Sequence, residues 1–177
     1  MIKKTRININ TSFKIYIKVF LSFIFNTGKK NKKHFEKLIR NYFFTDNILL
    51  TSQGRVAAFN IFKVILSEKK KEILISPYTL TEVINSIIYA GGKPVYVEIN
   101  LKNGLPLEND LNKKINENTA GLVITHLYSN KEDILNFHKK YNGKIKIIED
   151  VAINFGAKID EHKFLGTLFD YGFYSFF

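Results

Sequence analysis

The chain has 177 residues, 45% of them hydrophobic, and it contains no cysteine. It is therefore too apolar for a disordered chain, and it has no disulfide framework, thiolate metal site or cysteine nucleophile. The net charge is +11, a balance common in proteins that bind nucleic acid or anionic membranes. Residues 1–71 hold 16 basic and 3 acidic side chains, net +13, whereas residues 72–177 hold 11 basic and 13 acidic, net −2. The basicity thus belongs to the amino-terminal end of the chain.

Residues 1–46 are predicted to form a basic, helical amino-terminal arm. Residues 13–25 are strongly apolar but interrupted by Lys14 and Lys18, and they are too few for a membrane span of about 20 residues. No small-residue cleavage site follows, which argues against a signal peptide. We expect a helix that packs its apolar stripe on the body or on a partner subunit; the alternative is a basic amphipathic segment on an anionic membrane. The apolar spacing from Phe35 to Phe43 predicts a second helix.

From residue 47 onward, short apolar runs alternate with helical patterns. Strands are predicted at residues 48–51, 72–76, 94–99, 120–125, 145–149 and 171–177. Helices are predicted at residues 55–66, 108–115 and 131–141, and a fourth is opened by the capping box Thr79-x-x-Glu82. Such alternation predicts an α/β domain with a mostly parallel sheet flanked by helices.

Polar residues follow several of the predicted strands, where an open parallel sheet binds its ligands. Gly54 lies at a strand-to-helix turn, which taken alone favours a plain tight turn and is only a weak signal of phosphate binding. Glu149 and Asp150 follow an apolar run, and such carboxylates are costly to bury without a positive partner. Asp150 is interpreted either as a helix N-cap or as a carboxylate aimed at a cationic ring nitrogen or a metal. No metal site is expected, because the four histidines show no ligand spacing.

Several segments, in this order, carry a resemblance to a known family. They are residues 51–59 (TSQGRVAAF), 76–79 (SPYT) with 90–95 (AGGKPV), 125–128 (THLY), 148–152 (IEDVA) with 156–157 (GA), and 166–177. Over residues 35–177 the chain resembles the DegT/StrS family of fold-type I, pyridoxal-phosphate-dependent aminotransferases, which act on nucleotide-linked keto sugars. The resemblance implies that residues 47–177 form an incomplete large domain, with the family's small domain absent.

The resemblance also implies cofactor-binding residues. Asp150 matches the aspartate that pairs with the pyridine nitrogen and keeps the ring an electron sink. Gly54 and Arg55 match the loop and helix amides that hold the cofactor phosphate, and Ser175 matches a serine that reaches the same phosphate. Thr79 lies on the loop that lines the ring.

Two positions depart from the family pattern. Leu80 replaces a frequent aromatic residue, which would add a stacking contribution of about 1 kcal/mol. Ile153 replaces the histidine or glutamine that hydrogen-bonds the cofactor's ring oxygen. His126 and Tyr128 are expected to bind substrate. The lysine that forms the Schiff base lies, by resemblance, a few residues beyond Phe177, so we expect no catalytic lysine in this chain and no activity from the chain alone.

The resemblance implies amino transfer from glutamate to a nucleotide-linked keto sugar, for surface-polysaccharide precursors, although some relatives dehydrate instead. It further implies pyridoxal 5′-phosphate as cofactor, a homodimer and a cytoplasmic location, with no nucleic-acid partner and no transmembrane segment. Two alternatives stay open. One is a degenerate, non-catalytic binding or regulatory partner of such an enzyme, and the other is a basic protein that binds membrane or nucleic acid through its first 71 residues.

Overall fold

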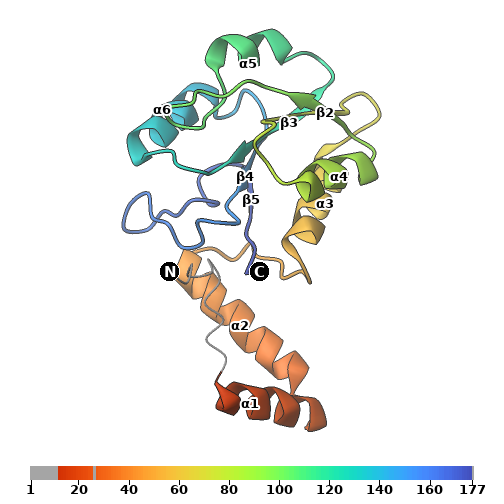
Figure 1. Ribbon diagram of the computed structural model, residues 1–177, viewed down its shortest axis with the longest axis vertical. Coiled ribbons are helices and arrows are strands. Elements are labelled where there is room, and N and C mark those ends of the chain that lie inside the picture. Colours follow the sequence, from red (N-terminus) through yellow and green to blue (C-terminus); the bar gives the residue numbers. More distant parts are fainter. Residues whose placement is uncertain (1–11, 26, 177) are drawn as a thin grey trace, which may run out of the picture. The chain divides into compact units, whose positions relative to one another are not determined.

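The computed structural model describes residues 12–25 and 27–176, and it divides the chain into two compact units, Met1–Ile48 and Leu49–Phe177 (Figure 1). The first unit contains helix α1 (Phe13–Ile24) and helix α2 (Gly28–Phe43). Both agree with the helices predicted for the basic arm. Residues 1–11 of the predicted arm lie outside the described residues.

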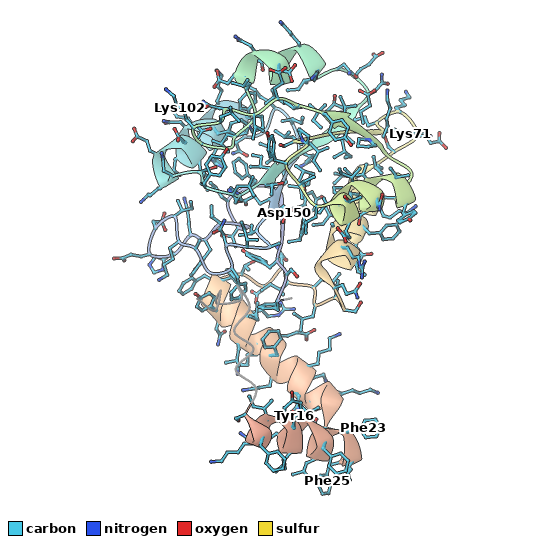
Figure 2. All side chains as sticks on the ribbon, in the orientation of Figure 1. Tyr16, Phe23, Phe25, Lys71, Lys102 and Asp150 are labelled. Carbon is cyan, nitrogen blue, oxygen red and sulfur yellow. The ribbon has the colours of Figure 1, made fainter. Side chains whose placement is uncertain are left out.

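Helix α1 exposes almost its whole surface. None of its residues is buried, and Phe23 is 85% exposed; Figure 2 shows Tyr16 and Phe23 projecting from this helix. Lys14, Lys18 and Ser22 fall on one side, because they are spaced four residues apart. The rest of the α1 surface is apolar. Whether the body, a partner subunit or a membrane covers it stays a prediction. No helix among the described residues is long and apolar enough to cross a membrane.

The second unit is built on one parallel sheet of five strands. These strands are β1 (Glu72–Ile75), β2 (Lys93–Tyr96), β3 (Thr119–Thr125), β4 (Ile147–Asp150) and β5 (Tyr171–Phe173). Their order is β2-β1-β3-β4-β5, and every paired neighbour is parallel. Pro94 lies in the edge strand β2, where a missing backbone N–H is tolerated. The predicted α/β class with a mostly parallel sheet is confirmed.

Helices cover both faces of the sheet. One face packs against α3 (Gly54–Ile65) and α4 (Thr81–Tyr89) around a core that contains Phe62, Ile75 and Ile148. The other face packs against α5 (Glu108–Lys114) and α6 (Lys131–Tyr141) around a second buried hydrophobic core that contains Leu122 and Phe137. We call these the α3/α4 face and the α5/α6 face.

Three predicted features are wrong in detail. Residues 48–51 form no strand, and Leu49 is 73% exposed, so this apolar run is not buried between neighbours. The capping box is also wrong, since α4 begins at Thr81 with Leu80 as N-cap and without a side-chain cap. The hydroxyl of Ser76 accepts a hydrogen bond from Tyr78 N at 3.0 Å, and this turn delays the helix. The predicted strand at 171–177 ends at Phe173, and its last residue, Phe177, lies outside the described residues.

Candidate functional site at the carboxyl edge of the sheet

The strand order reverses direction between β1 and β3. From β1 the chain steps outward to β2 and then returns to place β3 on the other side of β1. Such a switch point leaves a crevice beyond the carboxyl ends of the two strands, where open parallel sheets bind ligands. The loop after β1 carries Thr79, and β3 ends in Thr125 and His126. The candidate site therefore lies at this edge, which also includes the end of β4.

Alternation along the strands sorts the polar residues between the two faces. Ile148 belongs to the core of the α3/α4 face and Ile147 to that of the α5/α6 face. Since side chains alternate along a strand, Asp150 lies on the α3/α4 face and Glu149 on the other. Thr125 is the register partner of Asp150 and shares its face. One edge of the sheet thus presents two chemically different surfaces.

Asp150 is a nearly buried carboxylate at the end of β4. It is 4% exposed, and its Oδ1 accepts a hydrogen bond from Ala152 N at 3.1 Å. Burial raises the pKa of Asp150, whereas the Ala152 N–H and the nearby His126 oppose this rise. No helix follows Asp150 directly, so the N-cap interpretation is wrong. A carboxylate in this position is stabilised by a cationic group placed against it.

The start of α3 lies beside the end of the chain segment that follows β5. A Cβ added to Gly54 would stand 3.2 Å from the Cβ and 3.5 Å from the Oγ of Ser175. The N-cap of α3, Gln53, makes no side-chain cap, which leaves first-turn amides for another acceptor. Arg55 directs its Nε to Gln53 Oε1 at 2.6 Å. Gly54, Arg55 and Ser175 therefore meet at a helix N-terminus, an arrangement suited to a phosphate.

Two buried hydroxyl oxygens near this surface have no hydrogen-bond partner among the described residues. They are Thr79 Oγ1, in the loop after β1, and Thr125 Oγ1, at the end of β3. Buried polar atoms are rarely left unsatisfied in a folded protein. Together with Asp150 and the start of α3, they fit a ligand that carries a cationic ring nitrogen, polar ring substituents and a phosphate. Pyridoxal phosphate has these groups, so the residues present fit that cofactor.

The two departures from the family pattern are both exposed. Leu80 is 63% exposed and Ile153 is 65% exposed. Neither side chain can donate or accept a hydrogen bond, and neither is held in the core. They are available to cover a ligand by apolar contact only.

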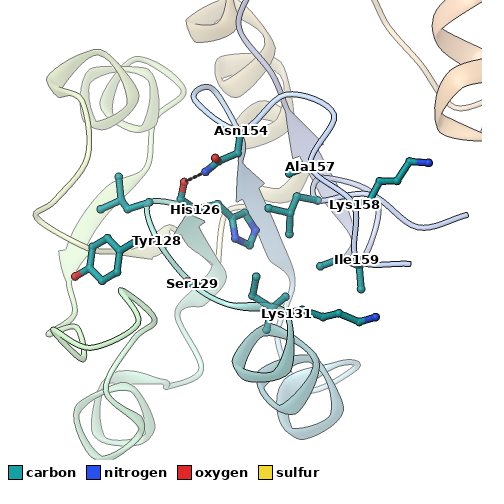
Figure 3. A pocket seen from close by; sticks show the side chains of 11 residues that line it. His126, Tyr128, Ser129, Lys131, Asn154, Ala157, Lys158 and Ile159 are labelled. Carbon is teal, nitrogen blue, oxygen red and sulfur yellow. Dashed lines mark hydrogen bonds between the residues drawn. The ribbon is translucent and has the colours of Figure 1, made fainter. Parts of the chain in front are cut away.

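His126 and Tyr128 follow β3, and the His126 backbone N donates to the Asp150 carbonyl at 3.0 Å, but the His126 side chain lies on the opposite face of the sheet from Asp150. His126 is 2% exposed and its Nε2 lies 3.0 Å from Glu149 Oε1, on the α5/α6 face. Both residues line a pocket of about 220 Å³ together with Lys131, Asn154 and Lys158 (Figure 3). The side-chain amide of Asn154 donates to the His126 carbonyl across this pocket. A substrate role for His126 and Tyr128 stays a prediction, and it would require a ligand that reaches this second surface.

The sequence did not reveal how Glu149 and the glycines near the end of the chain are used. Glu149 is completely buried and holds a turn 17 to 20 residues downstream, as its hydrogen bonds to Gly166, Leu168 and Phe169 show. Gly166 and Gly172 pack backbone against backbone. In the sequence, this close packing is signalled by the two glycines themselves, which lie six residues apart. Among the described residues, no group of three or more histidine, aspartate or glutamate side chains could hold a metal.

Known proteins that resemble this chain share both its sequence pattern and its fold. GDP-perosamine synthase of Escherichia coli O157:H7 is 29% identical over 129 residues, which cover 71% of this chain and 35% of the relative. The dTDP-4-amino-4,6-dideoxy-D-glucose transaminase of Shigella dysenteriae is 27% identical over 139 residues, covering 77% and 36%. The chain thus spans little more than a third of the length of these relatives.

Solved structures of aminotransferases resemble the fold of this chain. An aminotransferase from Psychrobacter cryohalolentis superposes with a TM-score of 0.76 at 20% identity, covering 95% of this chain and 44% of that one. NtdA from Bacillus subtilis, solved with bound cofactor PMP, gives a TM-score of 0.59 at 25% identity and covers 71% and 29%. The family described as DegT/DnrJ/EryC1/StrS aminotransferases matches residues 10–177. The chain belongs to this family, and its sheet and helices form part of the fold of the pyridoxal-phosphate-dependent aminotransferases.

Proposed function

We propose that this chain binds pyridoxal 5′-phosphate at the carboxyl edge of its sheet. It would do so as part of an aminotransferase that moves an amino group from glutamate to a nucleotide-linked keto sugar. The observation that carries the proposal is the gathering of Asp150, Thr125 and the Gly54–Ser175 contact on one face of the sheet. The relatives named above are a perosamine synthase and an amino-sugar transaminase, which supports the substrate class.

Each residue has a defined task toward the bound group. The amides at the start of α3 and the hydroxyl of Ser175 would hold the phosphate. Asp150 would accept a hydrogen bond from the protonated ring nitrogen and keep the proton there, because an opposite charge favours the ionised carboxylate. Thr79 lies on the loop beside the ring, and Leu80 would exclude water by apolar contact. When bound, the cofactor supplies a ring that accepts electrons from the bond being broken next to the amino nitrogen.

Binding of pyridoxamine 5′-phosphate, measured by isothermal titration calorimetry, tests the cofactor site. This form of the cofactor carries no aldehyde and so does not react with the many surface lysines. We expect saturable binding that Asp150→Asn and Ser175→Ala each weaken by roughly tenfold or more. Glu161→Gln, a matched change of an exposed carboxylate in the loop after β4, should leave the affinity unchanged. Equal affinities for all four proteins would contradict the site.

A second candidate function is binding without turnover. It is favoured by Ile153, because isoleucine cannot supply the hydrogen bond that the family places on the cofactor's ring oxygen. Because the Schiff-base lysine is expected beyond Phe177, the two functions are separated by joining the chain to the lysine-bearing remainder of a relative and measuring release of 2-oxoglutarate from glutamate in the presence of a nucleotide-linked keto sugar. Turnover by the protein supports the transferase. Saturable cofactor binding with no 2-oxoglutarate supports the binding or regulatory partner.

A further inference from the structure

Glu149 is a buried carboxylate to which the proposed chemistry gives no role. It is 0% exposed and lies next to Asp150, but it points to the opposite face of β4. Its Oε1 accepts from Gly166 N at 2.9 Å, and its Oε2 accepts from Leu168 N at 3.0 Å and Phe169 N at 3.1 Å. An isolated buried carboxylate is strongly destabilising, so these hydrogen bonds must stabilise Glu149. The same hydrogen bonds fix the turn at residues 164–169.

His126 completes the surroundings of Glu149. Its Nε2 lies 3.0 Å from Glu149 Oε1. The same Glu149 oxygen accepts from Gly166 N, so the His126 tautomer that carries its hydrogen on Nε2 is the one that suits this contact. The end of β3 is thereby tied to the same oxygen as the turn at residues 164–169. We call Glu149, His126 and this turn the Glu149 cage.

The Glu149 cage is connected to the proposed phosphate site by direct packing. A Cβ added to Gly172 would stand 2.6 Å from Gly166 Cα, so the cage turn and β5 touch backbone to backbone. The Tyr174 hydroxyl donates to the Leu165 carbonyl at 2.5 Å. The next residue, Ser175, is the one that lies against Gly54. A shift of the cage turn would therefore carry Tyr174 and Ser175 with it.

We propose that Glu149 is a positioning residue that places Ser175 against the start of α3 and so sets the preference of the site for a phosphate-bearing ligand. The inference rests on the proposed cofactor site and adds a residue on the opposite face of the sheet to it. Glu149 touches no part of the ligand. It acts through the turn at residues 164–169, Tyr174 and Ser175, in that order.

The test compares pyridoxamine 5′-phosphate with pyridoxamine, which lacks only the phosphate. The ratio of their two dissociation constants measures the phosphate preference of each protein. Glu149→Gln keeps the side-chain size but replaces one accepting oxygen by an NH2 group, which faces backbone N–H donors or the His126 donor. We expect this variant to lose about tenfold of the phosphate preference, the same loss that we expect for Ser175→Ala, while its affinity for pyridoxamine stays within about twofold.

The double variant Glu149→Gln/Ser175→Ala shows whether the effect passes through Ser175. We expect it to lose no more of the preference than Ser175→Ala alone, because residues that act through one another are not additive. Glu72→Gln, a carboxylate at the amino end of β1 bonded to Lys93 and Asn116, is the matched control and should keep the full preference. If Glu149→Gln does not fold, Tyr174→Phe decides, with an expected loss of about threefold.

Each outcome has one meaning. A folded Glu149→Gln protein that keeps the full preference, or that loses affinity for both ligands equally, overturns the positioning role and leaves the proposed cofactor site intact. An additive double variant overturns the route through Ser175. A wild-type protein that binds neither ligand overturns the proposed function, and the inference falls with it.

Discussion

Replacing Gly172 by alanine tests the contact on which the end of the sheet depends. Gly172 lies in β5, and an added Cβ would stand 2.6 Å from the Cα and 2.7 Å from the carbonyl carbon of Gly166. Both neighbours are backbone atoms, so neither can rotate away as a side chain would. The added Cβ can be accommodated only if β5 or the turn at residues 164–169 moves. Forced overpacking of this kind costs about 3 kcal/mol, at the upper end of its usual range.

Urea unfolding followed by circular dichroism measures the loss. With a slope of about 1–3 kcal/mol/M, a loss of 3 kcal/mol lowers the midpoint by roughly 1–3 M. Gly143→Ala is the matched control, because Gly143 has a φ of +77° but no atom within 4 Å of the added Cβ. It should lose only about 1 kcal/mol, from backbone strain. A Gly172→Ala protein at least as stable as Gly143→Ala would refute the packing described for these two glycines.

Three further predictions test other parts of the structure. Burial raises the pKa of Asp150 in the folded protein. The free energy of unfolding of the ligand-free protein should therefore fall as pH rises from the ordinary aspartate range through this raised pKa. Urea unfolding at a series of pH values should show this fall in the wild-type protein and not in Asp150→Asn. Ile153→His should tighten binding of pyridoxamine 5′-phosphate by about two- to tenfold, because it supplies one hydrogen bond, and an unchanged dissociation constant would mean that residue 153 does not face the ring. Phe137→Ala should cost about 3–5 kcal/mol in urea unfolding, whereas Phe23→Ser, at an 85% exposed position of α1, should stay within about 0.5 kcal/mol; similar losses for both would contradict the assigned core.

The sequence pattern predicted the sheet well where strands are buried on both faces. The strands β1, β3 and β4 each contain consecutive apolar residues, at 73–75, 122–124 and 147–148, as burial on both sides of a parallel sheet favours. The run at residues 48–51 has the same composition but no neighbouring strand, and composition alone cannot report a missing neighbour. The start of α4 was misplaced because the side chain of Ser76 holds a turn that the capping-box pattern does not encode.

The candidate site was predictable where a residue acts from its own position in the chain. Asp150 follows an apolar strand, and Gly54 opens a helix, so both could be identified from local sequence. The role of Glu149 could not, because its partners come from a loop without periodicity and from the end of another strand. The placement of the His126 and Asp150 side chains on opposite faces of the sheet likewise depends on the alternation along each strand.

A crystal structure of this chain grown with pyridoxamine 5′-phosphate tests the central claim most directly. We predict the phosphate at the start of α3, in contact with the amides of Gly54 and Arg55 and with Ser175 Oγ, and the ring nitrogen against the Asp150 carboxylate. Ligand bound at the pocket beside His126 and Lys158, with the Asp150 carboxylate free of it, would contradict the account.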